Sequence, residues 1–229
     1  GDLRLGLAAM AARDVRDPWW TPAPLEGEPC AQRAALCLRP DGMDTAPEVV
    51  AALQDAAARL RAAGWTVDEV ADLPPLREAS EVQTMLWVGD NYEAMLAAAE
   101  KEGDPGALNI LRFHQEPARK IDLNAYAALL TRRNAISRQW QLFLEQTPLV
   151  LTPVSAQLPF ADNQDLQGKT AFAAVWEAQM TQIALPVIGM PGLTVSTGMV
   201  GNTPVGVQLI AGRFREDICL QAGAAIEAG

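Results

Sequence analysis

The side chains that could act as a nucleophile or a base are scattered along this sequence. Serine catalysis needs a hydroxyl group beside a base, together with hydrogen-bond donors for the developing oxyanion. No serine lies in a glycine-rich turn or in the elbow sequence of a hydrolase, and no serine and lysine stand in a recognisable pair. The sequence therefore predicts no catalytic residue among its serines, lysines and single histidine, which are Ser80, Ser137, Ser155, Ser196, Lys101, Lys120, Lys169 and His114.

Other kinds of site find no support in the sequence either. There is no phosphate-binding glycine loop, no dinucleotide fingerprint and no cluster of metal-ligand residues, so we expect no cofactor and no metal. The net charge of −10 argues against a nucleic acid partner, because phosphate binding needs clustered Lys and Arg. No apolar run is long enough to cross a membrane, so no membrane partner is expected. Cys30, Cys37 and Cys219 are odd in number and widely spaced, which predicts reduced thiols in a cytoplasmic protein.

Residues 184–212 have the most distinctive pattern in the chain. Two prolines and two glycines between residues 184 and 192 should break any helix and require a tightly turned backbone. Two apolar runs follow, at 193–197 and 205–210, with turn-forming residues between them. This order predicts a β-hairpin whose loop is longer than two residues.

The second run of the hairpin carries two residues that need an explanation. Gly206 indicates a close approach of another backbone, because glycine is otherwise unfavourable inside a strand. Gln208 lies among apolar residues and needs a hydrogen-bond partner if it is buried. We therefore single out Gln208 and Thr194 as polar groups of the hairpin. Since apolar residues occupy both faces of 205–210, this strand should be covered on both sides within a larger sheet.

Three runs in this part of the chain resemble the C-terminal signature of the amidase signature family: 189–198, 204–210 and 213–217. The match is specific over 184–227, and the order and length of the chain agree with the family from residue 30 onward. The resemblance implies an α/β fold with a mixed β-sheet flanked by helices. It also implies hydrolysis of a carboxamide to an acid and an amine or ammonia, by a serine nucleophile, a second serine and a lysine. The segments that carry those three residues in the family would precede this chain.

The resemblance also suggests where a substrate would bind. Thr152-Pro153 follows an apolar strand and resembles the family's loop beside the active site. Residues 172–183 recur at helical spacing and lead into the signature, which would place this helix against the acyl side of the substrate; a plain core role for its face remains open. The candidate substrate-binding residues are Thr152, Pro153, Trp176, Gln179, Met180, Ile183, Gly189 and Met190.

The chain divides into four segments on these patterns. Residues 1–29 form a helix and a Pro/Trp-rich connector, and 30–72 form a strand, a helix and a second, parallel strand. Residues 73–146 form a helical, lid-like region. Residues 147–229 form a strand, a helix, the hairpin and a final helix. Together they would make one C-terminal portion of an amidase domain.

Local signals predict several boundaries within these segments. Thr45 and Glu48 have the spacing of a capping box at a helix start. Residues 89–90 should break a long helix over 76–102. Asp122 should cap another helix. The inner residues of that helix would be Leu123, Tyr126, Leu130, Ile136, Trp140 and Phe143.

The sequence thus predicts part of an amidase that contributes scaffold and pocket wall and is inactive alone. Two alternatives remain open: a non-catalytic subunit of a split amidase, and a pseudo-enzyme or binding module on the same fold. The expected partners are a small-molecule amide and the N-terminal half of the enzyme. Self-association is also expected, because Trp19 and Trp20 suggest apolar surface that another chain or segment should cover.

Overall fold

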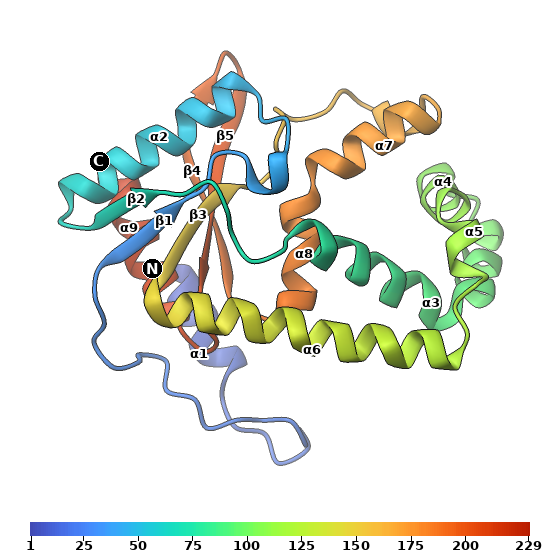
Figure 1. Ribbon diagram of the computed structural model, residues 1–229, viewed down its shortest axis with the longest axis horizontal. Coiled ribbons are helices and arrows are strands. Elements are labelled where there is room, and N and C mark those ends of the chain that lie inside the picture. Colours follow the sequence, from blue (N-terminus) through green and yellow to red (C-terminus); the bar gives the residue numbers. More distant parts are fainter.

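The computed structural model describes every residue from Gly1 to Gly229 and has a five-stranded mixed sheet in the order β2-β1-β3-β5-β4 (Figure 1). β1 (Arg33–Leu36) pairs in parallel with β2 (Thr66–Glu69) and with β3 (Leu149–Pro153). β5 (Thr203–Ala211) runs antiparallel to β3 and to β4 (Gly192–Val200). The predicted α/β class with a mixed sheet is confirmed, and so are the parallel strands of the strand-helix-strand unit.

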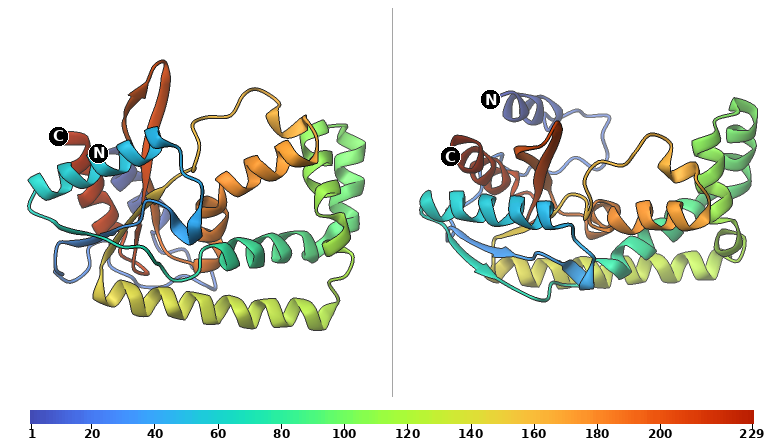
Figure 2. Two further views of the ribbon diagram at one scale, coloured as in Figure 1. Left: turned by 45° about the horizontal axis from the view of Figure 1, so that its top comes forward. Right: turned by 90° about the horizontal axis from the view of Figure 1, so that it is seen from above.

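Helices cover both faces of this sheet (Figure 1; Figure 2). α2 (Pro47–Ala62) and α9 (Glu216–Ala228) share one core cluster with one face. α3 (Arg77–Glu102), α6 (Leu123–Gln146) and α8 (Met180–Ile188) share a second cluster with the other face. Because side chains alternate along a strand, β3 can serve both clusters. All of its residues are buried, as the apolar run predicted.

The first helix of the strand-helix-strand unit begins differently from the prediction. The capping box of Thr45 and Glu48 is wrong: Ala46 is the N-cap of α2, and no side chain caps its amides. Pro47 occupies the first turn, where its missing N–H costs nothing because the amides there lack helical partners. Thr45 is buried and instead donates a hydrogen bond to the Met43 carbonyl, 3.4 Å away.

The helical region extends away from the sheet (Figure 1). α3 is interrupted at Asn91, which has φ −162° and ψ 54°, one residue beyond the predicted break. The second half of α3 packs with α4 (Pro105–Phe113) and α5 (Gln115–Ala118) around a small third core. This outer helical group therefore has a core of its own, separate from the two that flank the sheet.

α6 begins at the predicted cap, because an Asp122 carboxylate oxygen accepts a hydrogen bond from the Ala125 amide at 2.8 Å. The inner face was predicted only in part. Ile136 and Trp140 are fully buried, whereas Leu123 is 83% exposed because the first turn of α6 extends beyond the body that it packs against. Leu130 is exposed as well, so the inner face is confined to the second half of the helix.

The predicted helix over 172–183 is two helices. α7 (Lys169–Ala178) ends at Gln179, and α8 begins at the next residue. α8 also contains Pro186, so the prediction that prolines end the helix before 184 was wrong. A proline lacks the N–H that would bond to the fourth preceding carbonyl, so the usual helical bond from residue 186 to the Gln182 carbonyl is missing. Gly189 then ends α8 with a positive φ of 70°, which glycine adopts without strain.

The hairpin is tighter than predicted. β4 and β5 pair as far as Val200 and Thr203, which leaves a two-residue connection in which Gly201 has φ 59°. The extra length enters as an irregularity in β4 between Ser196 and Gly198. Gly206 confirms the close approach expected of it, since a Cβ there would lie 2.5 Å from the Val195 carbonyl oxygen.

The first 29 residues lie outside the three cores. α1 (Asp2–Met10) has no buried residue. Trp19 is 88% exposed, while Trp20 is partly covered and donates its indole N–H to the Ala11 carbonyl at 3.1 Å. Among the helices of the structure, none is both long and apolar enough to cross a membrane.

Candidate functional site

The loops that follow β1 and β3 border two clefts of the molecule. The chain leaves β1 for α2 on one face of the sheet and leaves β2 for α3 on the other. Where successive connections go to opposite faces, a crevice opens beyond the carboxyl ends of the strands, and ligands of α/β proteins bind there. Two clefts lie on either side of the 155–160 segment. We call them the switch-point cleft and the hairpin cleft.

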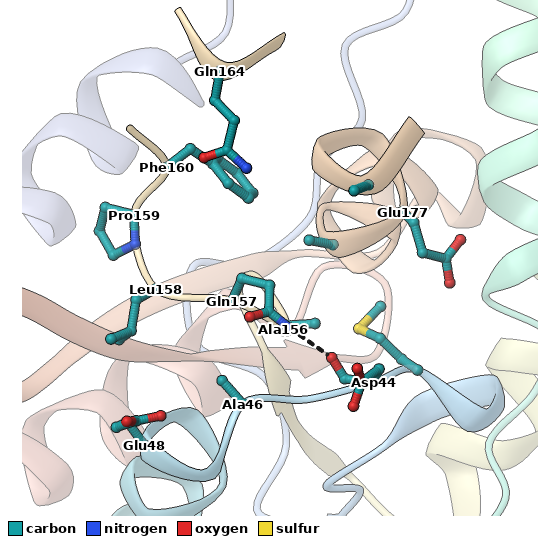
Figure 3. Close-up of a pocket in the computed structure, with 13 residues that line it drawn as sticks. Asp44, Ala46, Glu48, Ala156, Gln157, Leu158, Pro159, Phe160, Gln164 and Glu177 are labelled. Carbon is teal, nitrogen blue, oxygen red and sulfur yellow. Dashed lines mark hydrogen bonds between the residues drawn. The ribbon is translucent and has the colours of Figure 1, made fainter. Parts of the chain in front are cut away.

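The switch-point cleft has a volume of about 550 Å³ and lies between the β1–α2 connection, residues 156–160 and α7. Figure 3 shows three carboxylates around it, from Asp44, Glu48 and Glu177. Glu177 accepts two hydrogen bonds from the Arg77 guanidinium at 2.7 Å each, and these hold the pKa of its carboxyl below the usual value. Asp44 and Glu48 have no such partner, so this cleft disfavours an anionic ligand.

Hydrogen bonds between the bordering segments fix the shape of this cleft. The Ala46 amide donates to the Ala156 carbonyl at 2.8 Å, and the Ala156 amide donates to the Ala178 carbonyl at 2.8 Å. The Gln157 side-chain amide donates to the Asp44 carbonyl at 2.9 Å (Figure 3). The loops after β1 and β3 and the end of α7 are therefore held together as one wall.

The hairpin cleft has a volume of about 310 Å³ and opens between residues 154–160, the start of α8 and the β4–β5 hairpin. No charged side chain lines it. Its polar groups are amides and hydroxyls, which can donate and accept hydrogen bonds without carrying charge. They belong to Ser155 and Gln157 after β3, Gln179 and Gln182 near the α7–α8 junction, and Thr194 and Ser196 of β4.

A row of polar residues lies behind this cleft on one face of the sheet. Thr152 of β3 is opposite Gln208 of β5, and Gln208 is opposite Thr194 of β4. Residues directly opposite each other in a sheet point to the same face. Thr152 and Gln208 are buried, and the Gln208 side-chain amide donates to the Thr152 hydroxyl at 3.5 Å. The buried glutamine therefore has a partner, and the row reaches the surface of the cleft at Thr194.

Thr181 attaches α8 to the end of β3. Its side chain is completely buried, and its hydroxyl oxygen lies 2.8 Å from the Pro153 carbonyl and 3.0 Å from the Val154 carbonyl, within reach of donation to either. This contact positions the two glutamines of the hairpin cleft, Gln179 and Gln182, against the strand. Thr181 and Gln182 were not predicted from the sequence, although a threonine at the start of a mostly apolar stretch is a usable signal.

The structure brings only some of the predicted substrate-binding residues together. Gln179 lines the hairpin cleft, and Trp176 and Met180 line a cavity next to α3. Trp176 and Gln179 also share a further cavity beside α4. Thr152 and Pro153 are buried at the end of β3, behind the hairpin cleft.

The remaining candidates lie farther along α8. Ile183 is half-buried and borders neither cleft. Gly189 is the left-handed cap of α8, and Met190 packs into the core shared by α3, α6 and α8.

The serines and lysines do not meet. Lys101, Lys120 and Lys169 are exposed, and none forms a hydrogen bond with a serine. Ser155 and Ser196 border the hairpin cleft without a lysine or histidine among its lining residues. Groups of histidine, cysteine and acidic residues that could hold a metal do not occur in the structure.

The sheet and its two helical layers define an α/β protein, and a cleft lined by uncharged polar groups lies at the strand ends. This chain belongs to the amidase signature family, because the family model described as Amidase matches residues 1–220. The resemblance seen in the sequence is confirmed.

Several relatives agree in sequence along the whole chain. It is 36% identical over 229 residues to an indoleacetamide hydrolase of Bradyrhizobium diazoefficiens, with 99% of this chain and 44% of that protein covered. It is 37% identical over 238 residues to an indoleacetamide hydrolase of Bradyrhizobium japonicum, with 99% of this chain and 49% of that protein covered. The chain thus spans about half the length of these relatives.

Solved structures share the fold. A 6-aminohexanoate cyclic dimer hydrolase complexed with substrate superposes with a TM-score of 0.70 at 19% identity, covering 99% of this chain and 53% of that one. An allophanate hydrolase of Kluyveromyces lactis superposes with a TM-score of 0.75 at 18% identity, covering 99% of this chain and 37% of that one. At such identities the likeness concerns the fold alone.

Proposed function

We propose that this chain is the C-terminal portion of an amidase and forms one wall of its substrate cleft. The observation that carries the proposal is the hairpin cleft, whose polar groups are uncharged amides and hydroxyls in a chain of the amidase signature family. A carboxamide is itself uncharged and has both donors and acceptors of hydrogen bonds. The nucleophile and its base would lie outside these 229 residues, since no serine of the chain is placed beside a lysine.

In the reaction that the family implies, a serine outside this chain attacks the amide carbonyl carbon. The C–N bond breaks, the amine leaves with a proton delivered through the second serine and the lysine, and an acyl-enzyme remains. Water then supplies the oxygen that completes the carboxylic acid. The residues of this chain would bind and orient the amide. Gln179 and Gln182 would face it from α8, and Thr194 from β4.

Indole-3-acetamide is the first substrate to test. Two relatives that match nearly the whole chain at 36% and 37% identity are indoleacetamide hydrolases. The product would be the corresponding carboxylate with ammonia. The unpaired carboxylates Asp44 and Glu48 next to the cleft would disfavour retention of this anion, which supports release of the product.

The exposed edge of the sheet is a surface where the N-terminal half of the enzyme could pair. That half would belong either to the same polypeptide or to a separate chain. β4 is the last strand, and most of its residues are exposed or half-exposed. An uncovered edge strand has free amides and carbonyls that pair readily with another strand. Since the hairpin cleft borders β4, a segment joined there would lie beside the bound amide. The same contact would serve a split amidase, in which the nucleophile belongs to another chain.

We also propose that the outer helices of the 73–146 region act as a lid. They have a core of their own, and the interruption of α3 at Asn91 separates them from the part of α3 that packs on the sheet. The Asn109 side-chain amide donates to the Asp165 carbonyl at 2.7 Å, which ties α4 to the loop that continues from the cleft.

We further propose that the protein is located in the reducing cytoplasm, which the three unpaired cysteines support.

Substitutions in the hairpin cleft test the proposal. In a polypeptide of the full family length, Gln182→Leu and Thr194→Val should each lower kcat/KM for indole-3-acetamide by about fivefold, because each removes a hydrogen bond worth about 1 kcal/mol. Thr131→Val is the matched control, since Thr131 lies on the exposed surface of α6. Equal kcat/KM values for all three variants and the wild type would place the substrate elsewhere. Stoichiometric amide binding without hydrolysis in the full-length polypeptide would instead favour the binding-module alternative.

A further inference from the structure

A third cavity, which we call the His114 pocket, lies on the other side of the α7–α8 junction. It has a volume of about 440 Å³, within the range of small-molecule sites. The first half of α3 supplies Ser80, Thr84 and Met85 to it, and the α7–α8 junction supplies Trp176 and Met180. The break at Gln179 explains the placement: it directs Trp176 and Met180 into this pocket, whereas Gln179 itself borders the hairpin cleft.

Aromatic rings form one side of the pocket. The centre of the His114 ring lies 4.9 Å from that of Trp176. The Trp176 ring is stacked on Phe172, with centres 5.7 Å apart and planes 18° apart. Phe113 packs edge-on against His114 at 5.1 Å. Trp176 is held by this stack but remains partly exposed, so one region of its ring is available to a further flat group.

Polar groups in the pocket have spare hydrogen-bonding capacity. His114 is 6% exposed, and its Nε2 atom is buried without a hydrogen-bond partner. Burial lowers the pKa of His114, so the imidazole is neutral at neutral pH and can accept as well as donate. The Thr84 hydroxyl donates to the Ser80 carbonyl at 2.8 Å, whereas the Ser80 hydroxyl forms no hydrogen bond within the chain. An orphaned buried polar atom in a native structure calls for an explanation, and a ligand is one.

The charges at the mouth favour an uncharged ligand. Arg77 and Glu177 neutralise each other in a bidentate pair at 2.7 Å. Glu81 also lines the pocket and is not part of any ion pair. The excess of one negative charge would repel a carboxylate, and the paired guanidinium offers little attraction to compensate.

We infer that the His114 pocket binds a small, uncharged, planar aromatic molecule that carries an N–H or O–H group. The ring of the ligand lies against Trp176, between the thioether groups of Met85 and Met180. The imidazole of His114 and the hydroxyl of Ser80 form hydrogen bonds with the N–H or O–H group of the ligand. The pocket is distinct from the hairpin cleft, so this inference does not depend on the proposed amidase reaction.

Indole is the probe, because it has the ring and one N–H but no amide to engage the hairpin cleft. Calorimetric titration of the protein at pH 7.5 should give saturable binding at one site. Trp176→Ala should weaken it at least about tenfold through loss of the aromatic contact, and His114→Phe about fivefold through loss of the hydrogen bond. Indole-3-acetate should bind at least about tenfold more weakly than indole-3-acetamide. Trp87→Ala, at a 39% exposed tryptophan of α3 outside the pocket, and Gln182→Leu, in the hairpin cleft, should leave indole binding unchanged.

A second variant, which keeps Trp176 and His114, separates loss of the pocket from loss of the fold. Met85→Trp fills the pocket without removing Trp176 or His114, and it should abolish indole binding while thermal unfolding stays cooperative. Absence of saturable binding to the wild type would overturn the inference. So would binding that survives Trp176→Ala and Met85→Trp, or binding that Gln182→Leu removes.

The ligand of the pocket could be the aromatic ring of the amide substrate or a separate effector molecule, and a full-length amidase distinguishes the two. If the ring of the amide substrate occupies the His114 pocket, indole inhibits hydrolysis competitively. If a separate effector occupies it, indole binds at saturating amide and changes kcat. Either result supports the pocket, and the absence of both in an active enzyme would contradict it. If a full-length polypeptide binds indole in this pocket but hydrolyses no amide, the proposed amidase function is contradicted and the inference about the pocket stands.

Discussion

At the residue scale, the shape of the hairpin cleft depends on a few side chains that are buried beside it and hydrogen-bonded to fixed partners. Gln208 is buried in the sheet, and Thr181 fixes the start of α8 to the end of β3. Gly206 and Gln208 could be predicted, because a glycine and a glutamine inside an apolar strand each conflict with the strand pattern. Thr181 could not, since its role depends on two carbonyls that lie 27 and 28 residues away in the sequence.

Gly206→Ala should destabilise the fold by about 2 kcal/mol. The added Cβ would lie 2.5 Å from the Val195 carbonyl oxygen, which belongs to the paired strand and cannot move independently. The free energy of unfolding, measured by urea denaturation, checks this. Gly6→Ala is the control: nothing lies within 4 Å of its added Cβ, and alanine favours the helix there. A Gly206→Ala protein as stable as the control would mean that the strands are farther apart than described.

His114 should make stability depend on pH. Burial lowers its pKa in the folded state, so the unfolded chain takes up a proton near pH 6.5 while the folded chain does so only at lower pH. Stability is therefore fully present above pH 6.5 and falls as the pH is lowered from 6.5 toward the folded-state pKa. The charged groups that share its pocket are Arg77, Glu81 and Glu177, and burial is the cause of the lowered pKa of His114.

Unfolding midpoints between pH 8 and pH 5 measure the effect. Since His114 is the single histidine, the loss of stability just below pH 6.5 should largely disappear in His114→Phe. An identical pH profile in this variant would show that His114 is not the group responsible.

At the scale of elements, helical spacing and turn residues predicted most helices and strands, and tertiary contacts decided the rest. The 172–183 segment keeps helical spacing throughout, so the break at Gln179 could not be predicted from the sequence. Trp176 lines the His114 pocket and Gln179 lines the hairpin cleft, and both residues also line a further cavity beside α4. The hairpin connection was predicted too long because the irregularity between Ser196 and Gly198 lets β4 continue past a glycine. The predicted cap at Thr45 failed since the helix begins two residues later, at Pro47.

Thr181→Val tests how α8 is attached to the sheet. Valine has nearly the same shape but lacks the hydroxyl, so the Pro153 and Val154 carbonyls lose this contact. The free energy of unfolding should fall by about 1–3 kcal/mol. Amide hydrogen exchange should rise in α8 more than in α2. Thr131→Val, at a hydroxyl on the exposed face of α6, should change stability by less than about 0.5 kcal/mol. Equal effects of the two substitutions would remove the role assigned to Thr181.

At the scale of the whole molecule, the apolar residues left exposed are concentrated outside the cores. The first 19 residues alone expose several large apolar side chains, which are Leu3, Leu5, Met10, Val15 and Trp19. β4 adds an uncovered sheet edge with Met199 61% exposed. The sequence could suggest this surface from the paired tryptophans, but the position of β4 at the edge follows only from the strand order.

The isolated chain should therefore self-associate. Uncovered apolar area and strand edges favour contact between copies. Sedimentation velocity should show dimers or larger species whose proportion rises with protein concentration. Trp19→Ser together with Met199→Lys should shift the distribution toward monomer. A monomer across a hundredfold range of concentration, with no binding of a hydrophobic dye, would contradict this and favour a self-sufficient binding module.

We propose that this chain forms the substrate wall of an amidase whose nucleophile lies outside it. The most direct measurement is ammonia release from indole-3-acetamide, compared between the 229-residue chain and a full-length polypeptide that contains it. We predict release by the full-length polypeptide and only the uncatalysed rate for the chain alone. Hydrolysis by the purified chain, abolished by replacing Ser80, Ser137, Ser155 or Ser196, would contradict the account and place the nucleophile within these residues.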